Sequence, residues 1–121
     1  MDSIDHRTTL YYYKIFNIGT GRELFKIGIT FHTCWDRIYN TKFGKGWETE
    51  ILWEIKMADE LAYETEQFLK NKYSKHCSSC EAELIMSHGF TETFDYDITL
   101  YHEATQIIVE NAIASSIRSK Q

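Results

Sequence analysis

Two segments rich in aromatic and β-branched residues dominate the hydrophobic pattern at the start of the chain. They cover residues 10–17 and 24–30 and have the composition of half-buried β-strands. Gly19 and Gly21 lie between them and tolerate the positive φ angles that tight hairpin turns need. The pattern therefore predicts a β-hairpin. Its second strand contains Gly28, where the missing side chain allows backbone or a ligand to come close.

A short helix is predicted to follow the hairpin. Thr33 and Asp36 have the spacing of a capping box, which places the start of the helix near Cys34. A Gly-Lys-Gly sequence ends the helical pattern after Phe43. Arg37 lies roughly opposite a stripe of residues that share one face of this helix, so its side chain either faces solvent or points into a cleft. The stripe consists of Trp35, Ile38, Tyr39 and Lys42.

A third strand and a longer helix are predicted next. Residues 49–57 alternate between apolar and polar side chains, so one side of this strand is expected to face solvent. Asp59 is the expected N-cap of a helix over about 60–75. Glu64 and Glu66 lie at opposite margins of its apolar stripe, where a carboxylate is either a boundary residue or a group that faces a cleft. The stripe consists of Leu61, Thr65, Phe68, Leu69 and either Lys72 or Tyr73.

The rest of the chain predicts a small extension and a C-terminal helix. Residues 83–86 are interpreted as a short strand, and residues 88–94 as a turn that leads into an extended piece. The segment over about 99–119 has helical periodicity. Its apolar side consists of Leu100, Ala104, Ile107, Ile108, Ala112 and Ile117. The order β-β-α-β-α plus a helix predicts an α+β fold, with a three-stranded, mainly antiparallel sheet flanked by helices.

Composition predicts one domain over residues 1–121, with its core at about 10–94. Residues 1–9 are polar and are expected to form a loosely held arm. No apolar run approaches the length of a membrane span, and the N-terminus lacks the layout of a signal peptide, so a cytoplasmic location is expected. Three cysteines in that compartment are expected to be free thiols. For the Cys77-x-x-Cys80 pair, a loop is favoured over a metal or redox site, because no full ligand set is visible.

The charges are unevenly distributed along the chain. The formal net charge of −5 argues mildly against nucleic-acid binding. However, residues 14–45 contain six basic and two acidic side chains, whereas residues 81–110 contain seven acidic side chains and no Lys or Arg. A locally basic unit can hold phosphate on an acidic body, because salt screens the distant charges. The same pattern also fits a polarised domain that binds no nucleic acid.

The hairpin and the two helices after it resemble the GIY-YIG nuclease superfamily. The first strand of that family carries Gly-Ile-Tyr, and here residues 11–17, Tyr-Tyr-Tyr-Lys-Ile-Phe-Asn, place Tyr13 at the tyrosine position. The second strand carries Tyr-Ile-Gly and then Ser or Thr, and here residues 26–30 are Lys-Ile-Gly-Ile-Thr. Arg37 matches the arginine of the first family helix. Glu66 matches the glutamate of the later helix.

A phage and mobile-element branch of the superfamily resembles the chain in two further segments. Residues 24–30, Leu-Phe-Lys-Ile-Gly-Ile-Thr, are similar to its second strand, and residues 91–94, Thr-Glu-Thr-Phe, to its closing signature. The resemblance spans about residues 11–94. Two positions depart from the family pattern: Tyr11 replaces the glycine of the first motif, and Lys26 replaces the second tyrosine.

The resemblance implies a metal-dependent DNA endonuclease with four catalytic residues. Glu66 would hold Mg²⁺ or Mn²⁺ through its oxygens, and Arg37 would clamp a phosphate oxygen. Tyr13 would lie near the attacking water as general base or orienting group. Lys26 would act either as a charge donor or as a base. The implied substrate-binding residues are Lys14, Gly28, Thr30 and His32, of which His32 is also interpreted as a surface histidine.

A second interpretation keeps the fold without the catalysis. The net charge and the two motif departures are compatible with an inactive GIY-YIG-fold module that binds DNA or a protein partner. In that case the acidic stretch 81–110 would face the protein partner, and a basic surface would be its complement.

Overall fold

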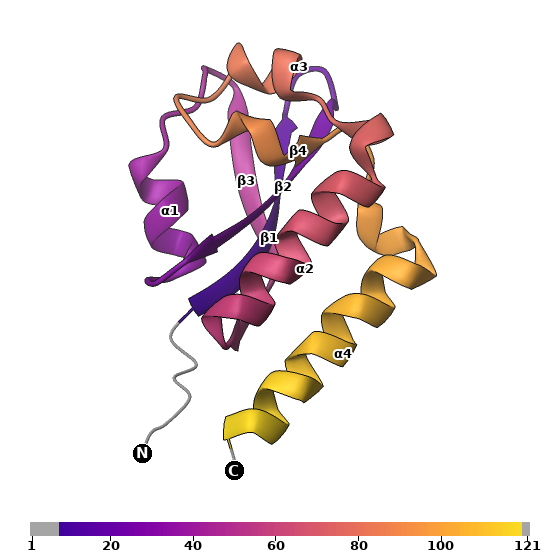
Figure 1. The fold of residues 1–121 in the computed structure, drawn as a ribbon. Helices are drawn as coiled ribbons and strands as arrows, with labels where there is room; N and C mark the ends of the chain where they lie inside the picture. Colours follow the sequence, from indigo (N-terminus) through magenta and orange to yellow (C-terminus); the bar gives the residue numbers. More distant parts are fainter. Residues whose placement is uncertain (1–7, 120–121) are drawn as a thin grey trace.

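The computed structural model describes residues 8–119 of the chain (Figure 1). The predicted N-terminal arm lies outside the described residues, except for Thr8 and Thr9, which belong to the first strand. The fold is α+β, and its sheet is antiparallel. The sheet has four strands in the order β3-β1-β2-β4, so the expectation of three strands was short by one. The strands are β1 (Thr8–Asn17), β2 (Glu23–Thr30), β3 (Trp47–Met57) and β4 (Thr93–Phe94).

The predicted hairpin is confirmed as β1 and β2. Its register places Tyr13 opposite Lys26 and Tyr11 opposite Gly28. In the turn Gly21 has a φ of 77°, which a residue with a side chain rarely adopts. The Asn17 side chain also accepts hydrogen bonds from two backbone N–H groups of the turn, each at 2.9 Å.

A β-bulge in β3 divides the apolar residues of this strand between the two faces of the sheet. Tyr12 pairs with Trp53 and Tyr13 pairs with Ile51, so Leu52 is the extra residue. One inserted residue reverses the side-chain alternation. Ile51 therefore packs on the same face as Tyr13, while Trp53 packs on the other face with Tyr12.

Helix α1 (Cys34–Asn40) begins where the capping box predicts, since the Thr33 hydroxyl accepts from the backbone N–H of Asp36 at 3.1 Å. Of the four residues in the predicted stripe, only Ile38 is buried. Cys34 and Ile38 face the sheet, whereas Trp35 and Tyr39 are 59% and 79% exposed. The helix also ends before Phe43, because the backbone is extended from Thr41 onward.

Helix α2 (Asp59–Lys72) starts one residue earlier than predicted. Its N-cap is Ala58, so the assignment of Asp59 as the cap was wrong; the Asp59 carboxylate instead accepts a hydrogen bond from the Thr8 hydroxyl. Phe68 was wrongly placed in the packed stripe and is 42% exposed. The buried residues of the helix are Leu61, Ala62, Thr65, Glu66 and Leu69, and Tyr73 after it is buried too.

The segment after α2 differs most from the expectation. It contains the 3₁₀ turn η1 (Ser74–His76), the short helix α3 (Ser79–Glu83) and the 3₁₀ turn η2 (Phe90–Glu92) before β4. The predicted strand at 83–86 is absent from the described chain, and Met86 makes only an isolated bridge with Phe43. Its apolar run is short, and a short run does not distinguish a strand from a buried helical turn.

The C-terminal helix α4 (His102–Ser119) follows the 3₁₀ turn η3 (Ile98–Leu100). Ala104 and Ile108 are buried as expected, but Leu100 and Ile117 were wrongly placed on the apolar side and are 68% and 55% exposed. No helix of the described chain combines the length and the apolar character that crossing a membrane requires.

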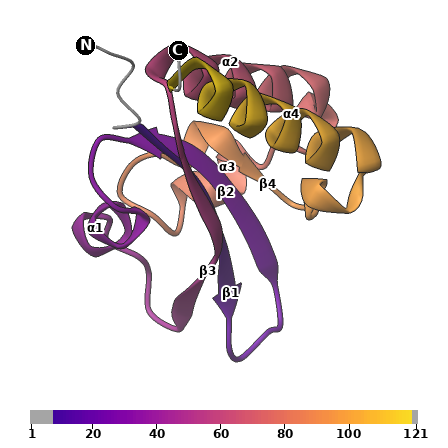
Figure 2. The same cartoon turned by 90° about the horizontal axis from the view of Figure 1, so that it is seen from below.

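The sheet separates two hydrophobic clusters. Figure 2 shows α2 and α4 together on one side of the sheet, and the cluster there contains Tyr12 and Phe25. The other cluster contains Tyr11 and Tyr13 and packs against α1 and α3. The two faces of the hairpin therefore belong to different environments. The candidate site lies on the face of Tyr11 and Tyr13.

Candidate functional site

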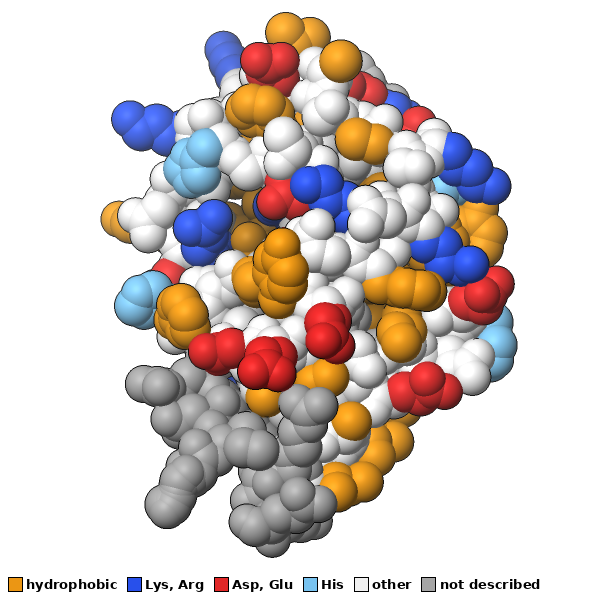
Figure 3. All heavy atoms as spheres, in the orientation of Figure 1, with side chains coloured by type: hydrophobic (Ala, Val, Ile, Leu, Met, Phe, Trp, Pro, Cys, Tyr) orange, Lys and Arg blue, Asp and Glu red, His pale blue; other side chains and the backbone are white. Residues whose placement is uncertain are grey.

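The four predicted catalytic residues come together on one face of the hairpin. Tyr13 and Lys26 are cross-strand neighbours on β1 and β2. Arg37 from α1 and Glu66 from α2 both act electrostatically on the Lys26 ammonium group. Figure 3 shows acidic and basic side chains around a hollow between α1 and α2. The sheet face, α1 and α2 thus contribute to one site.

Tyr11 also belongs to this site, although sequence reasoning had treated it only as a departure from a motif. A Cβ on Gly28 would overlap the Tyr11 hydroxyl and Cζ, so the tyrosine ring occupies the space that a side chain would fill. Burial raises the pKa of Tyr11, and a hydrogen bond with Arg37 opposes the rise. Strand alternation could have revealed this residue, because Tyr11 and Tyr13 have the same parity.

Tyr13 is fully enclosed. Its ring stacks on Tyr11 with 5.9 Å between centroids and meets Phe43 edge-on at 6.5 Å. Burial raises its pKa above the usual range for tyrosine, so the phenol is neutral at neutral pH. A neutral phenol can donate or accept a hydrogen bond and thereby orient a water molecule.

Lys26 is a buried cation with only 3% of its surface exposed. Burial lowers its pKa, while the negative charges of Glu92 and Glu66 oppose that effect. Its Nζ lies 3.9 Å from a carboxylate oxygen of Glu92. A buried ammonium group is costly unless it is paired, and Glu92 and Glu66 are the negative groups that offset this cost.

Glu66 is buried, whereas Glu64 is exposed on the same helix. The helical pattern did not decide which of the two carboxylates faces a cleft, and the structure distinguishes them by their burial. Burial and the nearby charge of Glu92 raise the pKa of Glu66, and Lys26 opposes the rise. The Gln67 amide donates a long hydrogen bond of 3.4 Å to one carboxylate oxygen.

Arg37 is the exposed member of the set. The helix that carries it is held at its start by two side chains: Thr33, described above, and Glu54 of β3, which accepts from the Cys34 N–H at 3.2 Å. At the other end the Thr41 hydroxyl donates to the Arg37 carbonyl oxygen at 2.8 Å. A seven-residue helix has little stability of its own, so these contacts help to hold the backbone that carries Arg37.

The predicted substrate-binding residues divide into two groups. Thr30 and His32 line a cavity of about 410 Å³ together with Arg37, and Gly28 precedes Thr30 on the same face of β2. Lys14 is not part of this group. It lies on the opposite face of the sheet from Tyr13, where its Nζ pairs with Glu23 and Glu50 at 3.3 Å each. The structure therefore does not bring Lys14 together with the other predicted site residues, because neighbouring strand residues point to opposite faces of a sheet.

Glu66 is the carboxylate that could hold a cation in this hollow. Carboxylate oxygens are the ligands that Mg²⁺ and Mn²⁺ prefer, and Glu92 adds a second negative group beside Lys26. Within the described residues, no group of three or more His, Cys, Asp or Glu side chains is arranged to hold a metal ion. Cys77 and Cys80 are exposed free thiols, and Cys34 is a buried one whose pKa burial raises to about 12.

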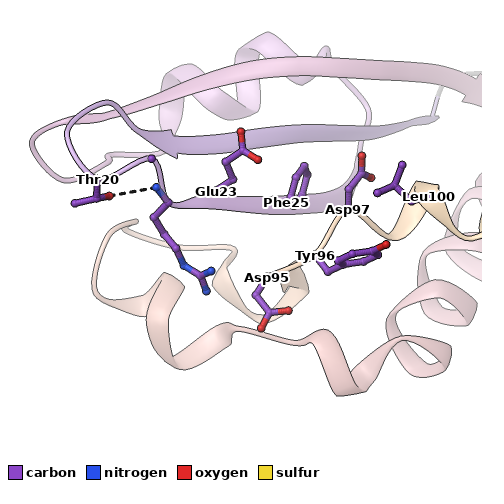
Figure 4. Close-up of a pocket in the computed structure, with 9 residues that line it drawn as sticks. Thr20, Glu23, Phe25, Asp95, Tyr96, Asp97 and Leu100 are labelled. Carbon is purple, nitrogen blue, oxygen red and sulfur yellow. Dashed lines mark hydrogen bonds between the residues drawn. The ribbon is translucent and has the colours of Figure 1, made fainter.

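A larger cavity of about 640 Å³ lies away from these residues, at the turn end of the hairpin. Figure 4 shows Glu23, Asp95 and Asp97 around it, with Phe25 and Tyr96 among its aromatic lining. Its carboxylates already have partners: Glu23 pairs with Lys14, Asp95 with His76 at 3.5 Å, and Asp97 accepts from Tyr12 at 3.0 Å. The larger of these two cavities is therefore not the one lined by Arg37, Thr30 and His32.

Comparison with known proteins gave no match to any family model, curated protein or solved structure.

Proposed function

We propose that the chain is a metal-dependent DNA endonuclease of the GIY-YIG type, related to the phage and mobile-element branch, that hydrolyses phosphodiester bonds. The observation that supports this proposal most strongly is the burial of Lys26 and Glu66 on one face with Tyr11 and Tyr13, behind the exposed Arg37. Burying an ammonium and a carboxylate costs stability, and such costs concentrate at functional sites.

The residues fit the requirements of phosphodiester hydrolysis. The oxygen of a water molecule attacks phosphorus, the bond to the leaving oxygen breaks, the water loses a proton and the leaving oxygen gains one. Arg37 can grip a phosphate oxygen in fork geometry, because its guanidinium is exposed beside the cavity of Thr30 and His32. Lys26 can neutralise the negative charge that develops on the phosphate. Tyr13, as a neutral phenol, can orient the water.

Glu66 is the residue that would hold Mg²⁺ or Mn²⁺, and the bound cation would supply further neutralisation of the phosphate charge. Burial disfavours the ionised carboxylate, so a divalent cation would compete with a proton for it. Metal binding should therefore weaken as the pH falls. The three free thiols fit a reducing compartment, and on this ground we also infer a cytoplasmic location.

The test is nicking of supercoiled plasmid in Mg²⁺ or Mn²⁺, with EDTA as the metal-free control. We expect nicking by the wild type and loss of it in Arg37→Ala and Glu66→Ala. The matched control is Glu64→Ala, which removes an exposed carboxylate from the same helix and should leave the rate unchanged. Nicking that survives both site substitutions would reject the assignment.

A second candidate function is a binding module of the same fold. The observation that favours it is the exposure of four acidic side chains in the stretch 81–110, of which Asp95 lies beside the cavity of Figure 4; the other three are Glu83, Glu103 and Glu110. A basic peptide segment would complement this surface. Absence of nicking, together with binding of an arginine-rich peptide that Asp95→Asn weakens and Arg37→Ala does not, would favour this function over catalysis.

A further inference from the structure

Glu92 is the carboxylate that faces the buried Lys26 ammonium group. The two groups are 3.9 Å apart, and 23% of the Glu92 side chain is exposed against 4% of the Lys26 side chain. Glu92 therefore lies between the buried cation and solvent. The Thr91 hydroxyl donates a hydrogen bond to the same carboxylate oxygen that faces Lys26, which restrains the orientation of the carboxylate.

The backbone around Glu92 is fixed against Lys26 at two points. Thr93, the next residue, pairs with Lys26 across β2 and β4, and its hydroxyl donates to the Phe90 carbonyl oxygen at 2.6 Å. Before the 3₁₀ turn, Gly89 has a φ of 78°, and a Cβ there would lie 3.4 Å from Lys26 Cε and Nζ. The segment that carries Glu92 thus covers the end of the lysine side chain.

The other charged groups around Lys26 come from the two helices. Glu66 on α2 attracts the ammonium group, whereas Lys70 on α2 and Arg37 on α1 repel it. Repulsion from these two cations favours displacement of the flexible lysine side chain from its present position. Glu92, which has the largest attractive influence, opposes that displacement.

We propose that Glu92 is a positioning residue that holds the Lys26 ammonium group in its place beside Glu66 and Arg37. This inference rests on the proposed nuclease function for its kinetic consequence, but the position of Lys26 can be tested without it. Glu92 does not touch the phosphate in this account and acts through Lys26.

The kinetic test measures single-turnover nicking and DNA affinity in Glu92→Gln, with Glu83→Gln, an exposed carboxylate on α3, as the matched control. We expect the rate to fall about tenfold in Glu92→Gln with little change in DNA affinity, because one charge-assisted contact is lost. In a Lys26→Met background the same substitution should have no further effect. An equal additional loss in that background would overturn the proposal.

The spectroscopic test records the ¹H–¹⁵N correlation of the Lys26 ammonium group, assigned by its disappearance in Lys26→Arg. We expect a resolved signal in the wild type and in Glu83→Gln, and its loss or displacement in Glu92→Gln and Glu92→Asp. An unchanged Lys26 signal in both Glu92 variants would overturn the proposal. If the wild type does not nick DNA, the proposed function fails, and this signal still decides whether Glu92 positions Lys26.

Discussion

The Tyr11 ring fills the space beside Gly28 that a side chain at position 28 would need. The Tyr11 ring lies where a side chain on the facing strand would be, so a tyrosine at one position requires a glycine at the other. This arrangement also brings the Tyr11 hydroxyl to Arg37.

Gly28→Ala should therefore destabilise the fold. The new Cβ would overlap the Tyr11 ring and displace it, at a cost of about 1–3 kcal/mol, as for other overpacked cores. Urea unfolding followed by fluorescence measures the change. Gly19→Ala is the control, because its Cβ would have its nearest contact at 3.4 Å and the cost should stay within about 0.5 kcal/mol. Equal stabilities of the two variants would contradict the steric explanation.

Glu66 predicts a pH-dependent stability effect. Its pKa in the folded protein lies above the ordinary value of 4.5, so the fold binds its proton more tightly than the unfolded chain does. The contribution of Glu66 to stability must then fall as the pH rises from about 4.5 through its folded pKa. Glu66→Gln does not titrate, so we expect it to be more stable than the wild type at pH 8 and nearly equal to it at pH 4.

Thermal unfolding of Glu66→Gln and wild type across this pH range is the measurement. Glu64→Gln should show no comparable pH-dependent gain, since Glu64 is exposed. A Glu66→Gln variant that is less stable than the wild type at pH 8 would show that the ionised carboxylate stabilises the fold, contrary to this account.

At the residue scale, the sequence predicts which face a residue lies on wherever the period of a strand or helix determines that face. Alternation places Tyr13 and Lys26 on one face, and the same rule excludes Lys14 and includes Tyr11, although motif matching had obscured both results. Glu92 could not be found in this way. Its contact with Lys26 depends on the fourth strand, which joins residues that are far apart in the sequence.

At the scale of elements, α1 depends on β3 for its position. The bulge at Leu52 reverses the alternation of β3, and Glu54 after the bulge reaches the first N–H group of α1. A strand without the bulge would direct Glu54 to the other face. The sequence showed the alternation of β3 and the start of α1, but it gave no sign of the extra residue that connects them.

Glu54→Gln should loosen α1 and thereby Arg37. Weakening a charged cap costs about 1 kcal/mol of helix stability. We expect faster amide hydrogen exchange in residues 34–40 and slower plasmid nicking than in the wild type. Glu48→Gln on the same strand is the control, because its exposed side chain lies far along the strand from α1. Unchanged exchange in α1 would refute this role of Glu54.

The segment between α2 and α4 marks where element prediction failed. Its pieces are two to five residues long and depend on contacts with distant parts of the chain, such as the pairing of Phe94 with Phe25. Such short pieces are too short to show a hydrophobic periodicity from which a helix or strand could be predicted. The long elements were predicted well, apart from their caps and the outer faces of α1, α2 and α4.

At the scale of the whole molecule, the sheet keeps structural and chemical tasks apart. The face that packs against α2 and α4 holds the larger apolar cluster, and the other face holds Tyr11, Tyr13 and Lys26. Glu66 reaches the second face although its helix packs mainly on the first. The site therefore lies where α1, α2 and the Glu92 segment meet beside the hairpin, and its cost in stability is offset by the separate core.

Single-turnover nicking of supercoiled plasmid in Mg²⁺, with wild type and Glu66→Gln compared at one pH, tests this arrangement most directly. Glu66→Gln keeps the shape of the side chain and should retain or improve stability, so loss of activity cannot be assigned to unfolding. The account predicts that the wild type nicks the plasmid and that the folded variant does not. Nicking by Glu66→Gln at the wild-type rate would contradict it.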